Sequence, residues 1–204
     1  MMLRLILAAA TAMSVAACAD NTRRYALEAT PSEKPVKLRA RVGTVLVRSV
    51  SLPTYAASEE IAFQDATGVI RLSDTELWAD DPERATTLVV SRHLNQMTSA
   101  TVAPQPWPLE EVPDAAVDIR VEQLVATNRG TLRLSGQYFI GGQEIEPDDS
   151  LDETPKTPRR RIRSRSRLFD IEVRLGSAEP GALARAQSDA LRVLSEEIAR
   201  DLAR

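Results

Sequence analysis

Residues 115–126, AAVDIRVEQLVA, alternate apolar and charged side chains with a period of two. The alternation places two kinds of side chain on opposite faces of a β-strand: Val117, Ile119 and Val121 against Asp118, Arg120 and Glu122. Residues 131–140, TLRLSGQYFI, repeat the pattern and gather one face of similar character: Leu132, Leu134, Gly136, Tyr138 and Ile140. The sheet predicted from these strands has one solvent-exposed face, so helices are expected to pack only on the other face.

Two stretches have the helical spacing needed to cover that apolar face. The first begins at residues 80–83, DDPE, which provide an Asp cap, Pro at the first position and an acidic first turn. It is predicted to run to about Ser99, with Val90, Leu94 and Met97 on its buried face. The second is predicted over residues 181–203, where apolar side chains recur at helical spacing: Ala190, Leu191, Leu194, Ile198 and Leu202.

The remaining strands are shorter. Residues 38–50 predict a strand that starts half exposed and ends buried, and Pro53 should terminate it. Residues 60–64 and 69–73 predict a hairpin around Gly68, and residues 104–108, PQPWP, predict a stiff extended link. This order leaves room for few strand–helix–strand crossovers. The predicted class is therefore α+β, a mostly antiparallel β-sheet with two α-helices packed on one face.

Residues 161–175 predict an unusual strand, because one of its faces changes character along its length. Arginines come first on that face and apolar residues follow: Arg161, Arg163, Arg165 and Arg167, then Phe169, Ile171, Val173 and Leu175. We therefore expect its first half to leave the core and to project with the end of strand 131–140 as a hairpin arm. Residues 141–160 between them hold six acidic residues and three prolines, and we expect a mobile acidic loop.

The amino terminus has the layout of a secretory signal. Arg4 precedes an apolar run that ends in Val15-Ala16-Ala17-Cys18, and the run is too short to span a membrane. The pattern resembles the lipobox of bacterial lipoproteins, in which the Cys thiol is diacylated after the preceding peptide is removed. The alternative is a plain signal peptide that contains a Cys by chance. Cys18 is the only cysteine, so it has no disulfide partner in the chain, and two or three acyl chains would hold it on a membrane.

These features predict the organisation of the chain. Residues 1–17 form a lipoprotein signal peptide, and residues 18–37 form the lipidated Cys and a flexible tether, in which Tyr25-Ala26-Leu27 could be a short strand. Residues 38–204 form a single α+β domain. The net charge is −3 with the signal, and removal of Arg4 makes it about −4, which argues against a nucleic-acid partner.

No catalytic or cofactor-binding constellation is recognisable. His93 is the only histidine, and its place at the edge of an apolar helix face favours a structural role. One His and one acylated Cys cannot assemble a metal site built on such ligands, and no Gly-rich loop precedes a helix. Trp78 and Trp107 are interpreted as core or rim residues. We therefore expect no enzyme activity, no cofactor and no metal.

The arginine run is the most suggestive charged feature. Arg161, Arg163, Arg165 and Arg167 could simply form a solvated strand face paired with the acidic loop. Alternatively, they contact anionic lipid headgroups or an acidic partner, because arginine binds phosphate and carboxylate groups bidentately.

Several short motifs in order resemble the auxiliary lipoproteins of ABC-type transport systems, whose best-known member is paraquat-inducible protein C (PqiC). They are Tyr25-Ala26-Leu27, Leu52-Pro53-Thr54-Tyr55, Leu77-Trp78-Ala79-Asp80, Pro106-Trp107 and the Ala- and Leu-rich last helix. This chain has Asp80-Asp81-Pro82 where the family has a glutamate, a proline and a leucine, and its insert at 141–160 is longer than the family's compact hairpin.

The resemblance implies a lipoprotein anchored on the periplasmic face of the outer membrane, working with MCE proteins in envelope lipid transport. Ala19 after Cys18 agrees with outer-membrane sorting, since an Asp there would resemble an inner-membrane retention signal; Asp20 follows one place later. We expect a docking lipoprotein with an MCE-type partner, and self-association is plausible. The alternatives are a small lipid-binding carrier with a pocket between helices and sheet, and an envelope hydrolase using His93.

Overall fold

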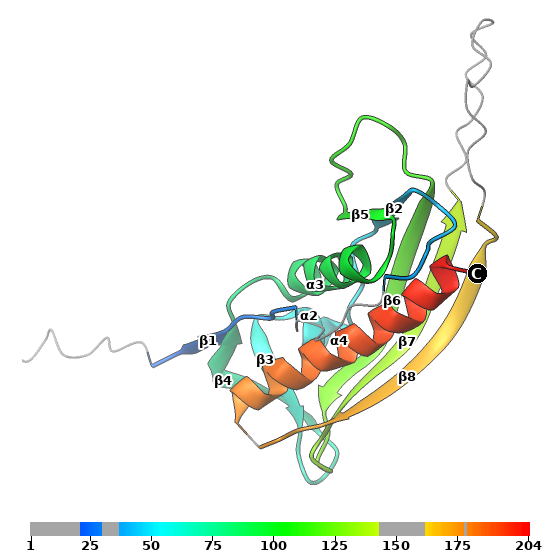
Figure 1. The fold of residues 1–204 in the computed structure, drawn as a ribbon. Coiled ribbons are helices and arrows are strands. Elements are labelled where there is room, and N and C mark those ends of the chain that lie inside the picture. The colour runs from blue at the N-terminus through cyan, green and yellow to red at the C-terminus, as the bar shows by residue number, and fades with distance from the viewer. Residues whose placement is uncertain (1–20, 30–36, 143–161, 178) are drawn as a thin grey trace, which may run out of the picture.

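The computed structural model describes residues 21–29, 37–142, 162–177 and 179–204 (Figure 1). Cys18, Arg161 and most of the acidic 141–160 segment lie outside the described residues. Eleven elements follow one another in the described chain: β1 (Arg23–Tyr25), β2 (Thr44–Val47), α2 (Thr54–Ala57), β3 (Glu60–Gln64), β4 (Ile70–Trp78), α3 (Pro82–Met97), β5 (Thr101–Pro104), β6 (Ala115–Ala126), β7 (Thr131–Gly142), β8 (Arg165–Arg174) and α4 (Pro180–Leu202).

The long strand β6 is the centre of an eight-stranded sheet in the described part of the chain. One edge of β6 pairs with β7 along its whole length, and β7 pairs with β8, so these strands form an antiparallel ribbon. The other edge of β6 is shared: β2 pairs near its start, at Ala115–Val117, and β3 pairs at Ala126. Strands β4 and β1 extend the sheet beyond β3, and β5 extends it beyond β2.

The α+β class with two helices on one face is confirmed, and the sheet is mixed rather than mostly antiparallel. Four strand pairs are parallel: β1 with β4, β2 with β5, β2 with β6 and β3 with β6. The expectation of few crossovers was wrong because β5 was not assigned from the sequence, and because the possible short strand at Tyr25-Ala26-Leu27 was placed in a tether and not in the sheet. Strand β5 lies between the end of α3 and the Pro-rich link, and a four-residue strand has too few positions to show a period.

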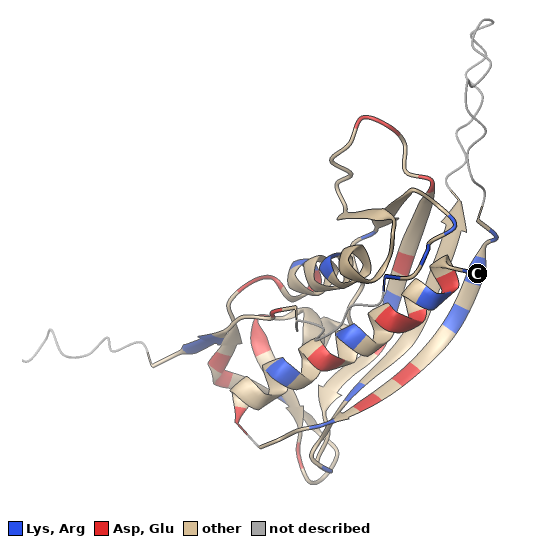
Figure 2. Ribbon diagram, in the orientation of Figure 1, with Lys and Arg blue, Asp and Glu red and all other residues tan. Residues whose placement is uncertain are grey.

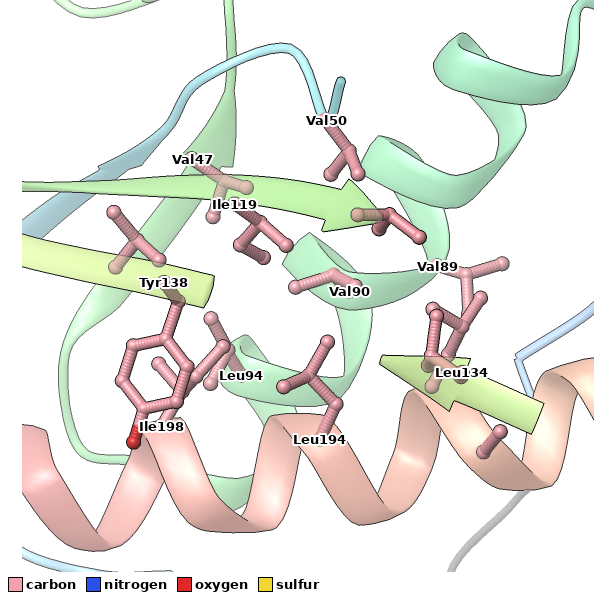
Figure 3. Close-up of a cluster of buried hydrophobic side chains, with 14 of the residues drawn as sticks. Val47, Val50, Val89, Val90, Leu94, Ile119, Leu134, Tyr138, Leu194 and Ile198 are labelled. Atoms are coloured by element: carbon pink, nitrogen blue, oxygen red, sulfur yellow. The ribbon is translucent and has the colours of Figure 1, made fainter. Parts of the chain in front are cut away.

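Helices α3 and α4 pack together on the apolar face of the sheet (Figure 1). Helix α3 begins as predicted, with Asp81 as the cap: its carboxylate accepts a hydrogen bond of 2.7 Å from the backbone N–H of Arg84. Figure 3 shows Val90, Leu94, Ile119 and Leu194 pointing toward one another between helices and sheet, and all four are fully buried. This layer is the core of the molecule.

The predicted strand at residues 38–50 is mostly not a strand. Only Thr44–Val47 form β2. The backbone N–H of Leu38 donates to the carbonyl of Met97 at the end of α3, and the backbone N–H of Arg41 donates to the carbonyl of Leu202 at the end of α4. The carbonyls at helix C-termini lack intrahelical partners, and this segment satisfies two of them.

The projecting arm predicted for the arginine strand is wrong. Strand β8 remains paired with β7 up to Arg165, which lies opposite Ile140, and Ile140 is buried. The face alternation itself is as predicted, since Arg165 and Arg167 share a face with the buried Phe169. The strand stays on the core because helix α4 supplies a carboxylate, Asp201, to which both arginines bind.

The first described residues belong to the folded domain. Strand β1 pairs in parallel with the end of β4, with Tyr25 opposite Trp78, and Tyr25 and Leu27 pack against the core. The tether expected over residues 18–37 is therefore not free between residues 21 and 29. Three residues in β1 are too few for period-two patterning to distinguish them from a linker.

Candidate functional site

The arginine end of the molecule is organised around Asp201, in the last turn of α4. Its carboxylate is 2% exposed and receives three charged or polar groups from the neighbouring sheet. Tyr138 on β7 donates a hydrogen bond of 2.9 Å to Oδ2, Arg167 lies 2.6 Å from Oδ2, and Arg165 lies 3.3 Å from Oδ1. Arg204, just past the helix, approaches Oδ1 at 3.5 Å. An ionised carboxylate this deeply buried needs such partners.

Tyr138 is held as a neutral donor. The side chain is fully buried and stacks against Phe169 with ring centroids 6.4 Å apart. Burial raises the pKa of the Tyr138 hydroxyl well above its ordinary value, and the hydrogen bond to Asp201 raises it further. The hydroxyl therefore donates to Asp201 at every physiological pH, which fixes the end of α4 to the sheet.

The structure describes three of the four arginines predicted as a contact surface: Arg163, Arg165 and Arg167. Arg165 and Arg167 each form an ion pair with Asp201, and their side chains remain 26% and 49% exposed. Arg163 precedes β8 and is exposed, with no ion pair to the described residues. Arg161 lies outside the described residues.

Sequence reasoning missed three cations at this end. Arg39 and Arg41 are exposed on the segment that runs past the end of α4, where Arg41 N donates to Leu202 O at 2.9 Å. Arg204 joins them at the carboxyl terminus. The alternation of residues 38–42 already placed Arg39 and Arg41 on one face, but only the fold shows that this segment lies beside α4. Figure 2 shows Lys and Arg positions in blue on the ribbon near the carboxyl terminus, on α4 and on the start of β8.

Helix α4 separates this arginine end from the first described strand. The ring of Tyr25 in β1 lies next to Gly181 in the first turn of α4: a Cβ built on Gly181 would be 3.8 Å from it. Asp201 is twenty residues further along the helix. At 1.5 Å per residue, the two ends are about 30 Å apart.

The site contains no recognisable catalytic arrangement among the residues that the structure describes. His93 is fully buried on α3, as expected for a structural residue. No cluster of three or more His, Cys, Asp or Glu side chains suited to a metal ion is found in the described ranges. None of the helices described there is both long enough and apolar enough to cross a membrane.

The carrier interpretation requires a cavity between helices and sheet. Two cavities touch Trp78, one beneath the amino-terminal segment and one between the sheet and the start of α4, and they hold about 10 Å³ each, which is room for no more than a water molecule. A larger groove of about 400 Å³ is open to solvent. It lies between residues 26–29 and α3, and its walls include Leu27, Leu88 and Arg92.

Comparison with known proteins identifies the family. The family described as ABC-type transport auxiliary lipoprotein component matches residues 25–199. No curated protein matches the chain. Two crystal structures share the fold. One, of an uncharacterized protein, has a TM-score of 0.65 at 14% identity and covers 88% of this chain and 97% of its own.

The second, of a Xanthomonas campestris protein of family DUF330, has a TM-score of 0.58 at 17% identity and covers 86% of this chain and 92% of its own. Identities this low show a shared fold alone. The family match is the stronger result, because it extends from the last residue of β1 nearly to the end of α4 and takes in strands β2 to β8. The chain belongs to the family of ABC-type transport auxiliary lipoprotein components.

Proposed function

We propose that the protein is a non-enzymatic docking lipoprotein, held on the periplasmic face of the outer membrane by acyl chains on Cys18. Its partner is an MCE-type protein of an ABC-type envelope lipid transport system. The observation that carries the proposal is the placement of the two ends of α4. Strand β1, which follows Cys18 by five residues, lies at one end, and the arginine cluster lies about 30 Å away at the other.

The short connection to Cys18 limits how far the domain stands from the membrane. Five residues span at most about 17 Å when fully extended. The end of the molecule that carries β1 therefore faces the lipid, and the arginine end faces away from it. Under this arrangement Arg163, Arg165 and Arg167 are contacts for an acidic surface of the transport partner rather than for headgroups, as is Arg161 if it lies beside them.

Mutation of the exposed Arg163 tests the docking surface. Arg163→Glu reverses a charge without touching Asp201, and Arg174→Glu makes the same change at the opposite, exposed end of the β8 strand. In-cell cross-linking of the full-length protein measures the yield of the cross-linked complex with the transport partner. This yield should fall at least fivefold with Arg163→Glu and should stay at the wild-type level with Arg174→Glu. Equal cross-linking in both variants would contradict the arginine contact.

Membrane fractionation tests the anchor. The full-length protein should sediment with the outer membrane, and Cys18→Ser should move it to the soluble periplasmic fraction, because acyl chains contribute roughly 0.8 kcal/mol per buried CH₂. A protein that is soluble in both forms would remove the docking proposal. The same preparations, run by analytical ultracentrifugation in mild detergent, measure whether several copies assemble around the partner.

The second candidate function is a carrier of lipid or another hydrophobic ligand. The open groove beside α3 favours it, since its volume is in the range of small-molecule sites and its walls combine the apolar Leu27, Leu88 and Val89 with the charged Glu28, Asp80 and Arg92. Native mass spectrometry of the full-length protein tests it directly. Co-purified ligand that Leu88→Glu removes would support the carrier, whereas an unliganded mass would count against it.

A further inference from the structure

The β3–β4 hairpin exposes four large apolar side chains. Phe63, Val69, Ile70 and Leu72 are 41%, 50%, 39% and 45% exposed. They are neighbours in the hairpin ladder, in which Ala62 lies opposite Leu72, Phe63 opposite Arg71 and Gln64 opposite Ile70. Figure 1 shows this hairpin extending below the body of the molecule, next to the turn between β6 and β7.

The four side chains lie on both faces of the hairpin. Residues directly opposite each other in an antiparallel pair share a face, and successive residues of one strand alternate between faces. Ile70 and Leu72 therefore lie on one face, and Phe63 lies on the other, where Val69 follows by alternation. A flat protein surface would cover only one of these faces. A lipid interface, by contrast, surrounds a shallowly inserted hairpin and covers both.

The polar groups of the hairpin turn are satisfied internally. The Asp65 carboxylate accepts hydrogen bonds from Thr67 N at 2.9 Å, Thr67 Oγ1 at 2.6 Å and Val69 N at 3.1 Å. Arg71 forms an ion pair with the same carboxylate at 2.7 Å. These contacts replace water, so removing the turn from bulk water costs less than it would for free charges.

The hairpin lies at the same end of the sheet as the start of the anchored chain. Strand β1 is parallel to β4, with Arg23 opposite Glu76, so the chain before Arg23 leaves β4 at the end where β4 begins. Leu72 is four residues before Glu76, about 13 Å along the strand. Cys18 is five residues before Arg23, at most about 17 Å away.

We propose that the β3–β4 hairpin is a second membrane contact, inserted into the headgroup and acyl-chain boundary of the bilayer that holds Cys18. This inference rests on the proposed function in one respect, the acylation of Cys18. The anchor brings the hairpin to the membrane, and the hairpin fixes the orientation of the domain on it. The arginine end is thereby held pointing away from the lipid, toward the transport partner.

Depth-dependent quenching tests the proposal with the full-length lipoprotein in vesicles of phosphatidylethanolamine and phosphatidylglycerol. Acylation uses the Cys18 thiol, so Val69→Cys and Leu72→Cys each introduce one labelling site, on opposite faces of the hairpin. Leu109→Cys is the matched control, because Leu109 is 47% exposed in the loop between β5 and β6. Each variant carries an environment-sensitive fluorophore, and a fraction of the lipids carries a quencher on the acyl chain.

Both hairpin labels should be quenched at least twice as strongly as the control label. Flotation of the vesicles distinguishes the two proposals. If the protein floats but neither hairpin label, or only one, is quenched more than the control, the membrane hairpin is wrong and the anchor stands. If the hairpin labels are not quenched, and the unlabelled Val69→Cys or Leu72→Cys protein forms disulfides between copies, a second copy covers the hairpin instead. If the protein does not float, the anchor is wrong and the inference fails with it.

Discussion

Gly136 lies where strand β7 meets a bulge in β6, between Val121 and Gln123. A Cβ at this position would overlap the backbone oxygen of Arg120 and would lie 2.9 Å from Val121 Cα and 3.0 Å from the ring of Phe169. Two of these three atoms belong to backbone, which cannot move without disturbing the ladder. The residue is glycine because of this close approach.

Gly136→Ala is expected to lower the free energy of unfolding by about 3 kcal/mol, because the added methyl group strains a paired strand. Gly141→Ala on the same strand is the control, since its nearest new contact, Ser164 Oγ, would be 3.7 Å away. It should change the free energy of unfolding by about 0.5 kcal/mol or less. Urea unfolding followed by circular dichroism measures both. Similar free energies of unfolding for the two variants would show that the backbone at Gly136 accommodates the added methyl group, contrary to this prediction.

Asp201 is the second residue whose environment decides its role. Asp201→Asn removes the charge that Arg165 and Arg167 share and should lower the free energy of unfolding by about 2 kcal/mol, less than for a fully buried pair because both arginines reach solvent. Tyr138→Phe should cost about 1 kcal/mol. Asp189→Asn, whose side chain is 43% exposed, should cost about 0.5 kcal/mol or less. An Asp201→Asn variant as stable as Asp189→Asn would contradict a structural role for the cluster.

The β3–β4 hairpin is the element with the clearest dependence on pH. The Asp65 carboxylate accepts hydrogen bonds from the Thr67 hydroxyl, from Arg71 and from two backbone N–H groups. Together these donors hold the pKa of Asp65 below its ordinary value, although desolvation opposes them. Asp170 on β8 behaves likewise, chiefly because Arg133 donates to it. A carboxyl group with a depressed pKa stabilises the fold above its unfolded pKa, and this stabilisation is lost as the pH falls toward the folded pKa.

The urea midpoint of the wild type should therefore decrease as the pH is lowered from about 4.5 to 2, a range that begins just above the ordinary pKa of aspartate and extends below it. Asp65→Asn should flatten this decrease without abolishing it, because Asp170 still titrates. Asp74→Asn, an exposed aspartate of the same hairpin, is the control and should keep the wild-type slope. An unchanged slope in Asp65→Asn would show that the hairpin contributes nothing to acid unfolding.

At the scale of the whole molecule, α4 connects the two ends of the fold. It contacts β1 at its start, β7 and β8 along its length, and α3 beside it. Leu194, fully buried near the middle, packs in the layer shared by helices and sheet (Figure 3). Loss of this packing is therefore expected to weaken the entire domain rather than one segment.

Leu194→Ala should lower the free energy of unfolding by about 3 kcal/mol, with coincident transitions in circular dichroism and in the fluorescence of the buried Trp78. Leu88→Ala on α3, where the side chain is 39% exposed, should cost about 1 kcal/mol or less. Transitions that separate in Leu194→Ala would indicate that α4 unfolds on its own and that the ends of the molecule are not coupled.

Local sequence patterns predict the fold class, both long helices, the cap at Asp81, the hairpin and the ribbon of β6, β7 and β8. These elements are long enough, or have specific enough end signals, for local patterns to specify them. The sequence also predicted the signal layout and the resemblance that the family match confirms. Tertiary structure alone decided the parallel pairings of β1, β2 and β5, because strands of three or four residues carry no readable period.

The candidate site divides in the same way. The arginine face of β8 follows from alternation, which is local. That two of these arginines bind Asp201, and that Arg39, Arg41 and Arg204 lie at the same end, depends on where α4 ends relative to the sheet. Contacts between residues more than thirty positions apart are set by packing of whole elements. No local pattern encodes such contacts, which is why only the tertiary structure places the carboxylate beneath the arginines.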